Sequence, residues 1–250
     1  MSRRYALRDD QWERSESLLP DREDYVGVTA KDNRLFVEAV LYRYRVGIPW
    51  RDLPERFGLW KIVPTRFSPW AAGGVWEQVF RHPAGEAGNE YAMIDSTMVR
   101  AHQHSAQKEG ETQTIRRSRG GLSTKIHATV DALGNPTGFL LTPGQACGLE
   151  GADALWPALE APVVIADKGY DADQRLLQPL AQAGKAAVIP PKANRKSPCE
   201  YDSELYQARY LIENFFCQLK QFCALSTRYD KTARNFPAAV YLAFITIWLN

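Results

Sequence analysis

Apolar residues recur at helical spacing through the first third of the chain. Leu18-Leu19-Pro20 closes a first predicted helix, and a second runs from Asp32 to about Arg45, where Gly47 ends it. Pro49–Gly58 and Trp60–Trp76 are then predicted to form two short helices separated by a glycine turn. This succession has the outline of a helix-turn-helix, with a plain helical bundle as the open alternative.

Two prolines fall inside the last of these predicted helices, at Pro64 and Pro69. An interior proline removes a backbone hydrogen bond and kinks a helix. We therefore expect any DNA-recognition helix in this segment to be short or bent.

The periodicity becomes strand-like after the glycine- and proline-containing stretch Pro83–Asn89. Helices are predicted among the strands at Gln174–Ala183 and Asp202–Gln221. An antiparallel hairpin followed by alternating strands and helices predicts an α/β domain with a mixed sheet. We thus expect a small all-α domain at residues 1–85 and an α/β domain at residues 90–250. The predicted strands are Tyr91–Asp95, Thr124–Asp131, Gly138–Leu141, Pro162–Ala166 and Ala186–Ile189.

The composition is typical of a soluble folded protein, because 45% of the 250 residues are hydrophobic and 24% are charged. Met1–Trp12 lacks the apolar segment of a secretory signal. Phe236–Leu249 is shorter than the roughly 18 to 20 residues of a membrane-spanning helix, so we expect a core helix there. The four cysteines show no CxxC spacing and are expected to be reduced thiols. The net charge of +2 does not indicate a nucleic-acid partner by itself, so the placement of charges must decide.

Two aspartates follow short apolar runs. Asp95 comes after Ala92–Ile94, and Asp167 comes after Val163–Ala166. Both acids are therefore predicted to lie where a buried strand ends, which is where α/β sheets bind ligands. The alternative is that each aspartate only caps a following turn or helix.

A third acid lies on a predicted helix. Tyr206, Arg209, Glu213 and Lys220 are spaced by three, four and seven residues, so at about 100° per residue they share a stripe roughly 60° wide. The alternative is an ordinary surface ion pair between Arg209 and Glu213. An apolar stripe beside these residues should pack against the sheet; it contains Leu205, Ile212, Phe215, Phe216 and Leu219.

Three acids on separate elements suit two magnesium ions, because magnesium prefers carboxylate and phosphate oxygens. Such a metal pair supports in-line displacement at phosphorus. Arg209 and Lys220 would then contact the phosphate backbone, and Tyr206 would stack on a base or pack beneath it.

Basic residues also gather in Arg116–Gly121, which holds three cations and two glycines. This composition suits a flexible loop along a DNA backbone, and a solvated surface loop is the alternative. His102 and His104 have metal-like spacing, but no second His or Cys pair accompanies them, so we do not expect zinc. His127 alternates with apolar neighbours in its predicted strand and receives no role.

These motifs together resemble those of bacterial insertion-sequence transposases of the DDE class, in the insertion-sequence-five branch. The resemblance runs from about residue 7 to the last residue. The motifs that carry it are Pro49-Trp50-Arg51-Asp52-Leu53-Pro54, Ile94-Asp95-Ser96-Thr97 with His102, Arg117 to His127, Leu141-Thr142-Pro143-Gly144, Ala166-Asp167-Lys168-Gly169-Tyr170-Asp171, the set Tyr206, Arg209, Glu213 and Lys220, and Thr227-Arg228-Tyr229-Asp230-Lys231.

The resemblance implies a ribonuclease-H-like fold, with a mixed sheet and flanking helices, after a helix-turn-helix-like domain. It implies that Asp95, Asp167 and Glu213 hold two magnesium ions, with manganese able to replace them. The 46 positions between Asp167 and Glu213 leave no room for a large insertion domain, so we expect a compact catalytic domain. The residues expected to contact DNA are Tyr206, Arg209, Lys220, Arg117, Arg119, Lys125, Arg228 and Lys231.

The implied reaction has two steps. Water cuts a phosphodiester at the end of the element, and the freed 3′-hydroxyl attacks target DNA. We expect a homodimer on double-stranded DNA, in the cytoplasm and associated with the nucleoid, without a membrane partner. The alternatives are a decayed or domesticated transposase that only binds DNA, and a nuclease that cuts but never joins.

Overall fold

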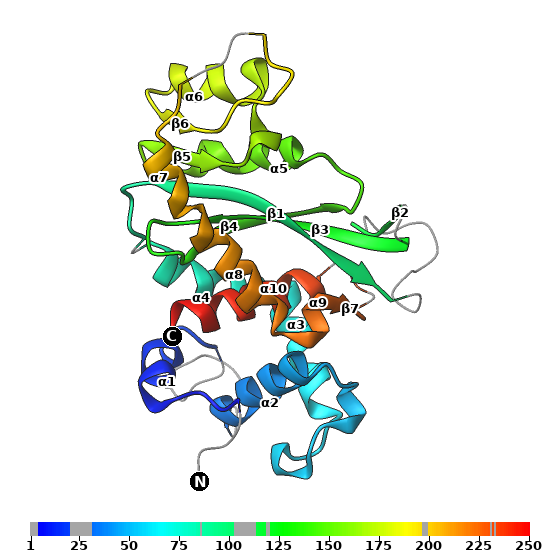
Figure 1. Ribbon diagram of the computed structural model, residues 1–250. Coiled ribbons are helices and arrows are strands. Elements are labelled where there is room, and N and C mark those ends of the chain that lie inside the picture. Colours follow the sequence, from blue (N-terminus) through cyan, green and yellow to red (C-terminus); the bar gives the residue numbers. More distant parts are fainter. Residues whose placement is uncertain are drawn as a thin grey trace. The chain divides into compact units, whose positions relative to one another are not determined.

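The computed structural model describes residues 5–20, 32–85, 87–102, 114–118, 121–196, 200–230, 232 and 234–250 (Figure 1). Contacts divide the chain into two compact units. The helical unit comprises Met1–Gly85, His102–Thr112 and Leu219–Asn250, and the sheet unit comprises Glu86–Ala101 and Gln113–Gln218. The helical unit therefore takes segments from both ends of the chain and one segment from between the two parts of the sheet unit.

The helical unit contains both long and single-turn helices, coloured from blue to cyan and from orange to red in Figure 1. Two 3-10 turns, Trp50–Asp52 and Glu55–Phe57, connect the second and third helices. A short strand, β7 (Thr227–Arg228), precedes the last helix. The helices are α1 (Asp9–Glu16), α2 (Asn33–Val46), α3 (Ile62–Ala72), α4 (Val75–Ala84), α9 (Cys223–Ser226) and α10 (Asn235–Trp248).

The boundaries of α2 follow from local chemistry. The side chain of Asp32 accepts a hydrogen bond from the Leu35 backbone N–H, and Gly47 ends the helix in the left-handed region with φ 79°. The segment Trp60–Trp76 is not one helix, because the pair Gly73–Gly74 separates α3 from α4. Gly74 has φ 70°, a conformation that favours glycine.

The core of the helical unit is aromatic. Helix α10 packs against α3 and α4, with the ring centroids of Phe80 and Phe244 5.6 Å apart. The residues of α10 are buried along most of its length, as expected for a core helix. Among the described residues, no helix is long and apolar enough to cross a membrane.

A polar network is buried in the same unit. The Arg43 guanidinium and the Tyr44 hydroxyl both donate to Oδ2 of Asp230, at 3.3 and 3.1 Å. Burial, together with the neighbouring Asp230 carboxylate, holds the pKa of Tyr44 well above its usual value. Because an uncompensated buried charge is costly, this pair ties residue 230 firmly to α2.

The sheet unit is a mixed sheet with flanking helices, which confirms the predicted fold class. Its strand order is β2-β3-β1-β5-β6. Strand β1 is antiparallel to β3 and parallel to β5, which is parallel to β6; β2 and β4 pair with successive parts of β3. The strands are β1 (Ala92–Ala101), β2 (Arg116–Ser118), β3 (Gly121–Val130), β4 (Pro136–Pro143), β5 (Val163–Ala166) and β6 (Ala186–Val188).

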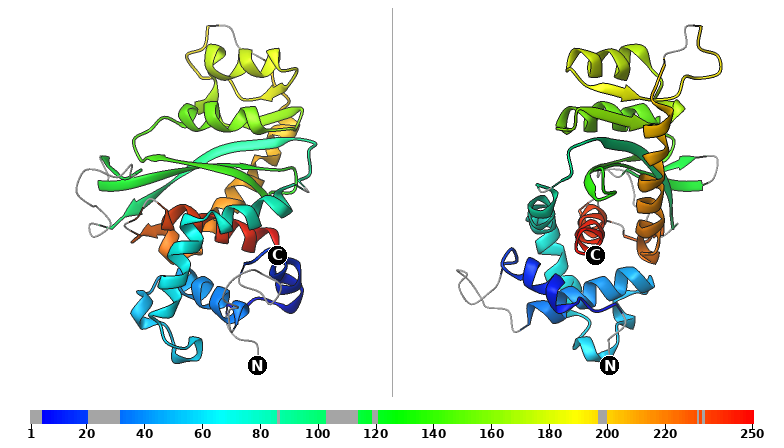
Figure 2. Two further views of the ribbon diagram at one scale, coloured as in Figure 1. Left: turned by 180° about the vertical axis from the view of Figure 1, so that it is seen from behind. Right: turned by 60° about the vertical axis from the view of Figure 1, so that its left-hand side comes forward.

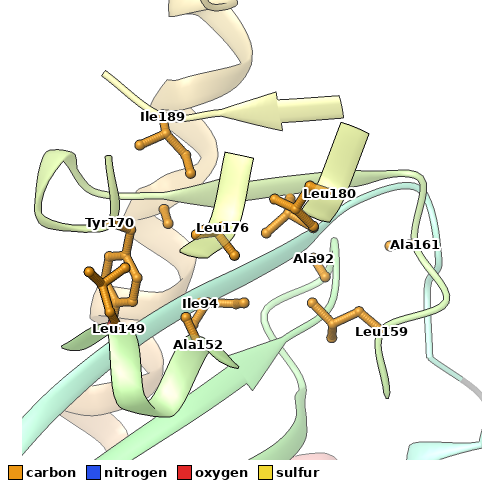
Figure 3. Packing of buried hydrophobic residues seen from close by; sticks show 12 residues of the cluster. Ala92, Ile94, Leu149, Ala152, Leu159, Ala161, Tyr170, Leu176, Leu180 and Ile189 are labelled. Carbon is orange, nitrogen blue, oxygen red and sulfur yellow. The ribbon is translucent and has the colours of Figure 1, made fainter. Parts of the chain in front are cut away.

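Helices cover this sheet (Figure 2). Helix α5 (Gly148–Leu155) packs against β1, β3 and β4, and α6 (Gln178–Gln182) packs beside β6. The predicted helix over Asp202–Gln221 is built as α7 (Ser203–Tyr206), a 3-10 turn and α8 (Tyr210–Lys220). A buried cluster between α5 and the sheet contains Ile94, Leu149 and Tyr170 (Figure 3).

Candidate active site

Asp95 lies on β1, and Asp167 directly follows β5, the neighbouring parallel strand. The last pair in the register of β1 and β5 is Ile94 with Ala166, so each aspartate is the next residue along the chain. Asp95 was expected at the end of a strand, but β1 continues to Ala101. The strand ends where predicted only in its pairing with β5, because the antiparallel pairing with β3 carries β1 further.

Asp167 begins a tight turn. Its Oδ1 accepts a hydrogen bond of 2.8 Å from the Gly169 backbone N–H, capping the 3-10 turn Lys168–Tyr170. A Cβ atom at position 169 would lie 2.8 Å from that same oxygen. Glycine at 169 therefore allows the Asp167 carboxylate to fold back onto the turn. Asp167 thus does cap a following turn, as the alternative interpretation of the sequence held, and this cap also fixes the direction of its carboxylate.

Asp95 is mostly buried, with 16% of its side chain exposed. Its Oδ1 accepts the Ser96 backbone N–H at 2.7 Å, and its Oδ2 accepts from Arg209 at 2.6 Å. Burial raises the pKa of Asp95, and the nearby negative charge of Asp167 adds to the rise. The Ser96 N–H and the Arg209 charge oppose it. The two aspartates are thus close enough to repel each other.

Arg209 connects two of the three predicted acids. One terminal nitrogen donates to Asp95, and the other donates to Oε1 of Glu213 at 2.6 Å. The ion pair between Arg209 and Glu213 that the sequence offered as an alternative does form, and the same guanidinium also reaches Asp95 on the sheet. Burial would lower the pKa of Arg209, yet the surrounding carboxylates raise it. Its Nε is buried and has no hydrogen-bond partner in the described structure.

Tyr206 lies close to the same acids. Burial raises the pKa of its hydroxyl, and the negative charges of Asp167 and Asp95 add to this, while Arg209 lowers it. The ring of Tyr201 meets the Tyr206 ring edge-on, with centroids 5.7 Å apart. Of the predicted helical stripe, Tyr206, Arg209 and Glu213 are thus close to one another. Lys220 is exposed at the end of α8 and belongs by contacts to the helical unit.

The donor chemistry of the three acids fits divalent cations. Carboxylate oxygens are the protein ligands that magnesium prefers, and a cation would relieve the repulsion between Asp95 and Asp167. Glu213 is turned onto Arg209 and is 57% exposed. Among the residues that the structure describes, no three acid, histidine or cysteine side chains converge closely enough to hold a metal ion. Completing such a site would therefore require Glu213 to leave Arg209.

The other residues predicted to contact DNA are distributed differently. Lys125 Nζ donates to the Ala146 backbone carbonyl and so holds a turn of the sheet unit. Arg117 has its backbone in β2, but its side chain lies outside the described part, as do Arg119 and Lys231.

Arg228, predicted to contact DNA, points into the protein rather than to its surface. Its side chain is fully buried, with the guanidinium 4.4 Å from the Phe236 ring centroid. Burial lowers the pKa of Arg228 to about 10, against the opposing effect of Asp230. The Nε of Arg228 donates to the Asp230 carbonyl. This arginine of a basic motif is thus used inside the protein. The Phe236 ring and the Asp230 carbonyl that contact it both follow it closely in sequence.

Two buried polar residues near the acids received no role from sequence reasoning. Tyr170 is 3% exposed, and burial with the charges of Asp95 and Asp167 raises the pKa of its hydroxyl. His127 lies under α5, where its Nε2 is 2.8 Å from Thr142 Oγ1. Burial lowers its pKa to about 4, so it is neutral at pH 7. Alternation with apolar neighbours in β3 was the available signal that His127 packs inside.

Comparison with known proteins places the chain in a family. The family described as "Putative transposase of IS4/5 family" matches residues 7–80, and "Transposase DDE domain" matches residues 88–249. No solved structure matches the chain.

Among curated relatives, the "Putative transposase for insertion sequence element IS6501" of Brucella ovis is 36% identical over 130 residues, which are 52% of this chain and all of the relative. An uncharacterized protein of Sinorhizobium fredii is 44% identical over 51% of this chain and 96% of its own length. An uncharacterized 16.2 kDa protein of insertion element IS402 from Burkholderia cepacia is 31% identical over 44% of this chain and 82% of its own length. Since the second family match spans well over half of the residues, the chain belongs to the transposase DDE domain family.

Proposed function

We propose that this chain is a DNA transposase that cuts at the ends of an insertion sequence and joins the freed 3′-hydroxyl to target DNA. The observation that carries the proposal is that Asp95 and Asp167 each directly follow the last paired residues of two neighbouring parallel strands, with Glu213 joined to Asp95 through Arg209. The family match supports the transposase assignment, and the chemistry of these side chains supports the steps described next.

Asp95, Asp167 and Glu213 would hold two divalent cations, magnesium or manganese. Bound there, such ions lower the pKa of the attacking oxygen and stabilise the leaving oxygen in an in-line displacement at phosphorus. The side chains of the protein would position the DNA phosphate beside these ions. Arg209 is the cation next to the acids, and its planar guanidinium suits bidentate contact with a phosphate.

A DNA phosphate would compete with the carboxylates for Arg209. Once Arg209 turns to the phosphate, Glu213 becomes free to complete the carboxylate set. Tyr206, adjacent to the acids, would stack on a base or support the arginine. In this scheme, substrate binding and assembly of the catalytic carboxylates occur together.

The helical unit would recognise the terminal repeats of the element. Exposed basic and polar side chains surround the beginning of α3, including Arg56, Lys61 and Thr65. Helix α3 is short, with Pro69 inside it, as expected for a short or bent recognition helix. We further propose that a homodimer brings two ends together on DNA associated with the nucleoid.

The test is incubation of the full chain with Mg²⁺ and duplex DNA carrying the element's ends and flanks, with nicked and joined products measured. Glu213→Gln removes one carboxylate charge at the site and should abolish both products. The matched control is Glu204→Gln, which makes the same change at an exposed position on α7 and should leave both products intact. Joined product from Glu213→Gln would refute the proposed triad.

The exposed position of Glu213 on Arg209 also leaves a DNA-binding protein without catalysis as a second candidate. In that case the native chain would bind the ends, by gel mobility shift, and yield neither product at any Mg²⁺ or Mn²⁺ concentration. Nicked product without joined product would instead support a nuclease.

A further inference from the structure

Residues 190–196 form a basic loop after β6, with Lys192, Arg195 and Lys196 close together in sequence. In a protein that acts on DNA, such a loop would be expected to point its cations outward. Two of the three turn inward instead. Lys192 and Arg195 both contact Asp171, which is 8% exposed.

Asp171 accepts three hydrogen bonds from two residues of this loop. Its Oδ2 accepts the Lys192 backbone N–H at 2.8 Å, and its Oδ1 accepts from the Arg195 guanidinium. Its backbone carbonyl accepts from Lys192 Nζ at 2.8 Å. Arg195 also forms an ion pair with Asp173, so one guanidinium spans two carboxylates. The side chain of Arg195 is only 15% exposed, which strengthens these charged contacts relative to a surface pair.

Asp171 lies at the end of the turn that Asp167 begins. The Asp171 N–H donates to the Lys168 carbonyl, and the Tyr170 N–H donates to the Asp167 carbonyl, so one hydrogen-bonded turn connects the two acids. Between them, Tyr170 is anchored in the buried cluster beside Leu149 (Figure 3). The catalytic-site aspartate is thus held on one side by β5 and on the other by Tyr170 and Asp171.

We propose that Asp171, with Arg195, is a positioning residue that sets the direction of the Asp167 carboxylate toward divalent cations. Residues that orient metal ligands commonly change metal affinity when they are replaced. Asp171 does not touch the reacting atoms and acts through the Lys168–Tyr170 turn. The inference rests on the proposed function, because it presumes that Asp167 holds a metal.

The test measures Mn²⁺ binding to the full chain on a duplex carrying the element's end, with free Mn²⁺ followed by electron paramagnetic resonance. Asp171→Asn keeps the size of the side chain and removes its charge, and it should weaken Mn²⁺ binding about tenfold. Arg195→Lys keeps the charge but cannot span Asp171 and Asp173, so it should weaken binding by a smaller factor. The double variant Asp171→Asn with Arg195→Lys should be no weaker than Asp171→Asn alone, because both changes break one contact.

Two controls separate positioning from stability. Asp153→Asn makes the same change in the exposed pair of Asp153 with Arg175 and should leave Mn²⁺ affinity unchanged. Ile126→Ala removes a fully buried side chain of the sheet unit outside the cluster that holds Tyr170, and it should lower the thermal midpoint without changing Mn²⁺ affinity in the folded protein. Native-like Mn²⁺ affinity of folded Asp171→Asn would overturn the inference. Absence of Mn²⁺ binding by the native chain would overturn the proposed metal site itself and, with it, the positioning role.

Discussion

Arg209 occupies the position of a cation among the three predicted acids. Its two short contacts partly neutralise Asp95 and Glu213. An arginine and a metal ion satisfy the same carboxylates, so they compete for them. At the proposed metal site of the free protein, the cost of breaking the Arg209 contacts would therefore subtract from the affinity for divalent cations.

Replacement of Arg209 should consequently have opposite effects on two measurements. Without DNA, Arg209→Gln should bind Mn²⁺ on the order of threefold to tenfold more tightly, because two ion pairs no longer have to be broken. With DNA, the same variant should show weaker cleavage, because the phosphate loses its cation. Calorimetric titration measures the first effect and product formation the second. Arg175→Gln, an exposed arginine, is the control, and an unchanged or weaker Mn²⁺ affinity of Arg209→Gln would contradict the competition.

At the scale of residues, local spacing singles out the three proposed acids but not the residues that contact them. Asp95 and Asp167 follow apolar runs, and Glu213 shares a helical stripe with Arg209, so short-range spacing marks all three. The contact of Asp171 with Arg195 joins residues 24 positions apart, with α6 and β6 between them, and no period connects them. The burial of Arg228 was missed because its charge favoured a surface interpretation, whereas the surrounding packing decides its exposure.

At the scale of elements, the approach of α5 to the sheet depends on a glycine. A Cβ atom at Gly151 would lie 2.1 Å from the His127 ring, which is fully buried. Helix propensity alone favours alanine over glycine by up to about 1 kcal/mol. The steric clash of an added Cβ atom with the His127 ring destabilises the fold instead. This clash outweighs the gain in helix propensity, because a buried ring has little room to move.

Gly151→Ala should therefore lower the free energy of unfolding by roughly 1 to 3 kcal/mol. The measurement is urea unfolding followed by circular dichroism. Gly85→Ala serves as the comparison, because a Cβ atom there meets no atom closer than 3.5 Å and the φ of Gly85 is ordinary. Stabilisation by Gly151→Ala would mean that α5 moves freely away from β3.

The sequence predicted most long elements and missed several short or polar ones. Alternating and apolar runs located β1, β3, β4, β5 and β6. The prediction for β1 stopped too early, because polar residues such as Thr97 and Arg100 in its second half interrupt the apolar run. Helix α5 was not predicted, since its eight residues include two glycines and offer a weak helical period. The basic segment was expected to be a loop, yet Arg116–Ser118 pairs with β3.

At the scale of the whole molecule, contacts and sequence suggest different divisions. The family matches separate residues 7–80 from residues 88–249, and the predicted domains separate residues 1–85 from 90–250. The contacts instead group Met1–Gly85 with Leu219–Asn250. Phe80 of α4 packs against both Tyr241 and Phe244 of α10, so removal of α10 would expose an apolar surface.

The division into independently folding domains can be tested with fragments. Residues 1–85 alone should lack a cooperative thermal transition, because their aromatic core loses α10. Residues 1–85 joined by a flexible glycine-serine linker to residues 219–250 should recover one. Circular dichroism and limited proteolysis measure both. A cooperative transition of residues 1–85 alone, similar to that of the joined segments, would establish the N-terminal part as a domain in its own right.

The order of synthesis gives the composition of the helical unit a biological consequence. The ribosome makes α1 to α4 first and α10 only after the entire sheet unit, so the N-terminal helices must wait for their packing partner. A polypeptide released early would carry the proposed DNA-reading helices without the core that supports them. Interrupted translation would then yield products that we expect to be degraded, rather than products that occupy the proposed DNA ends and block the complete chain.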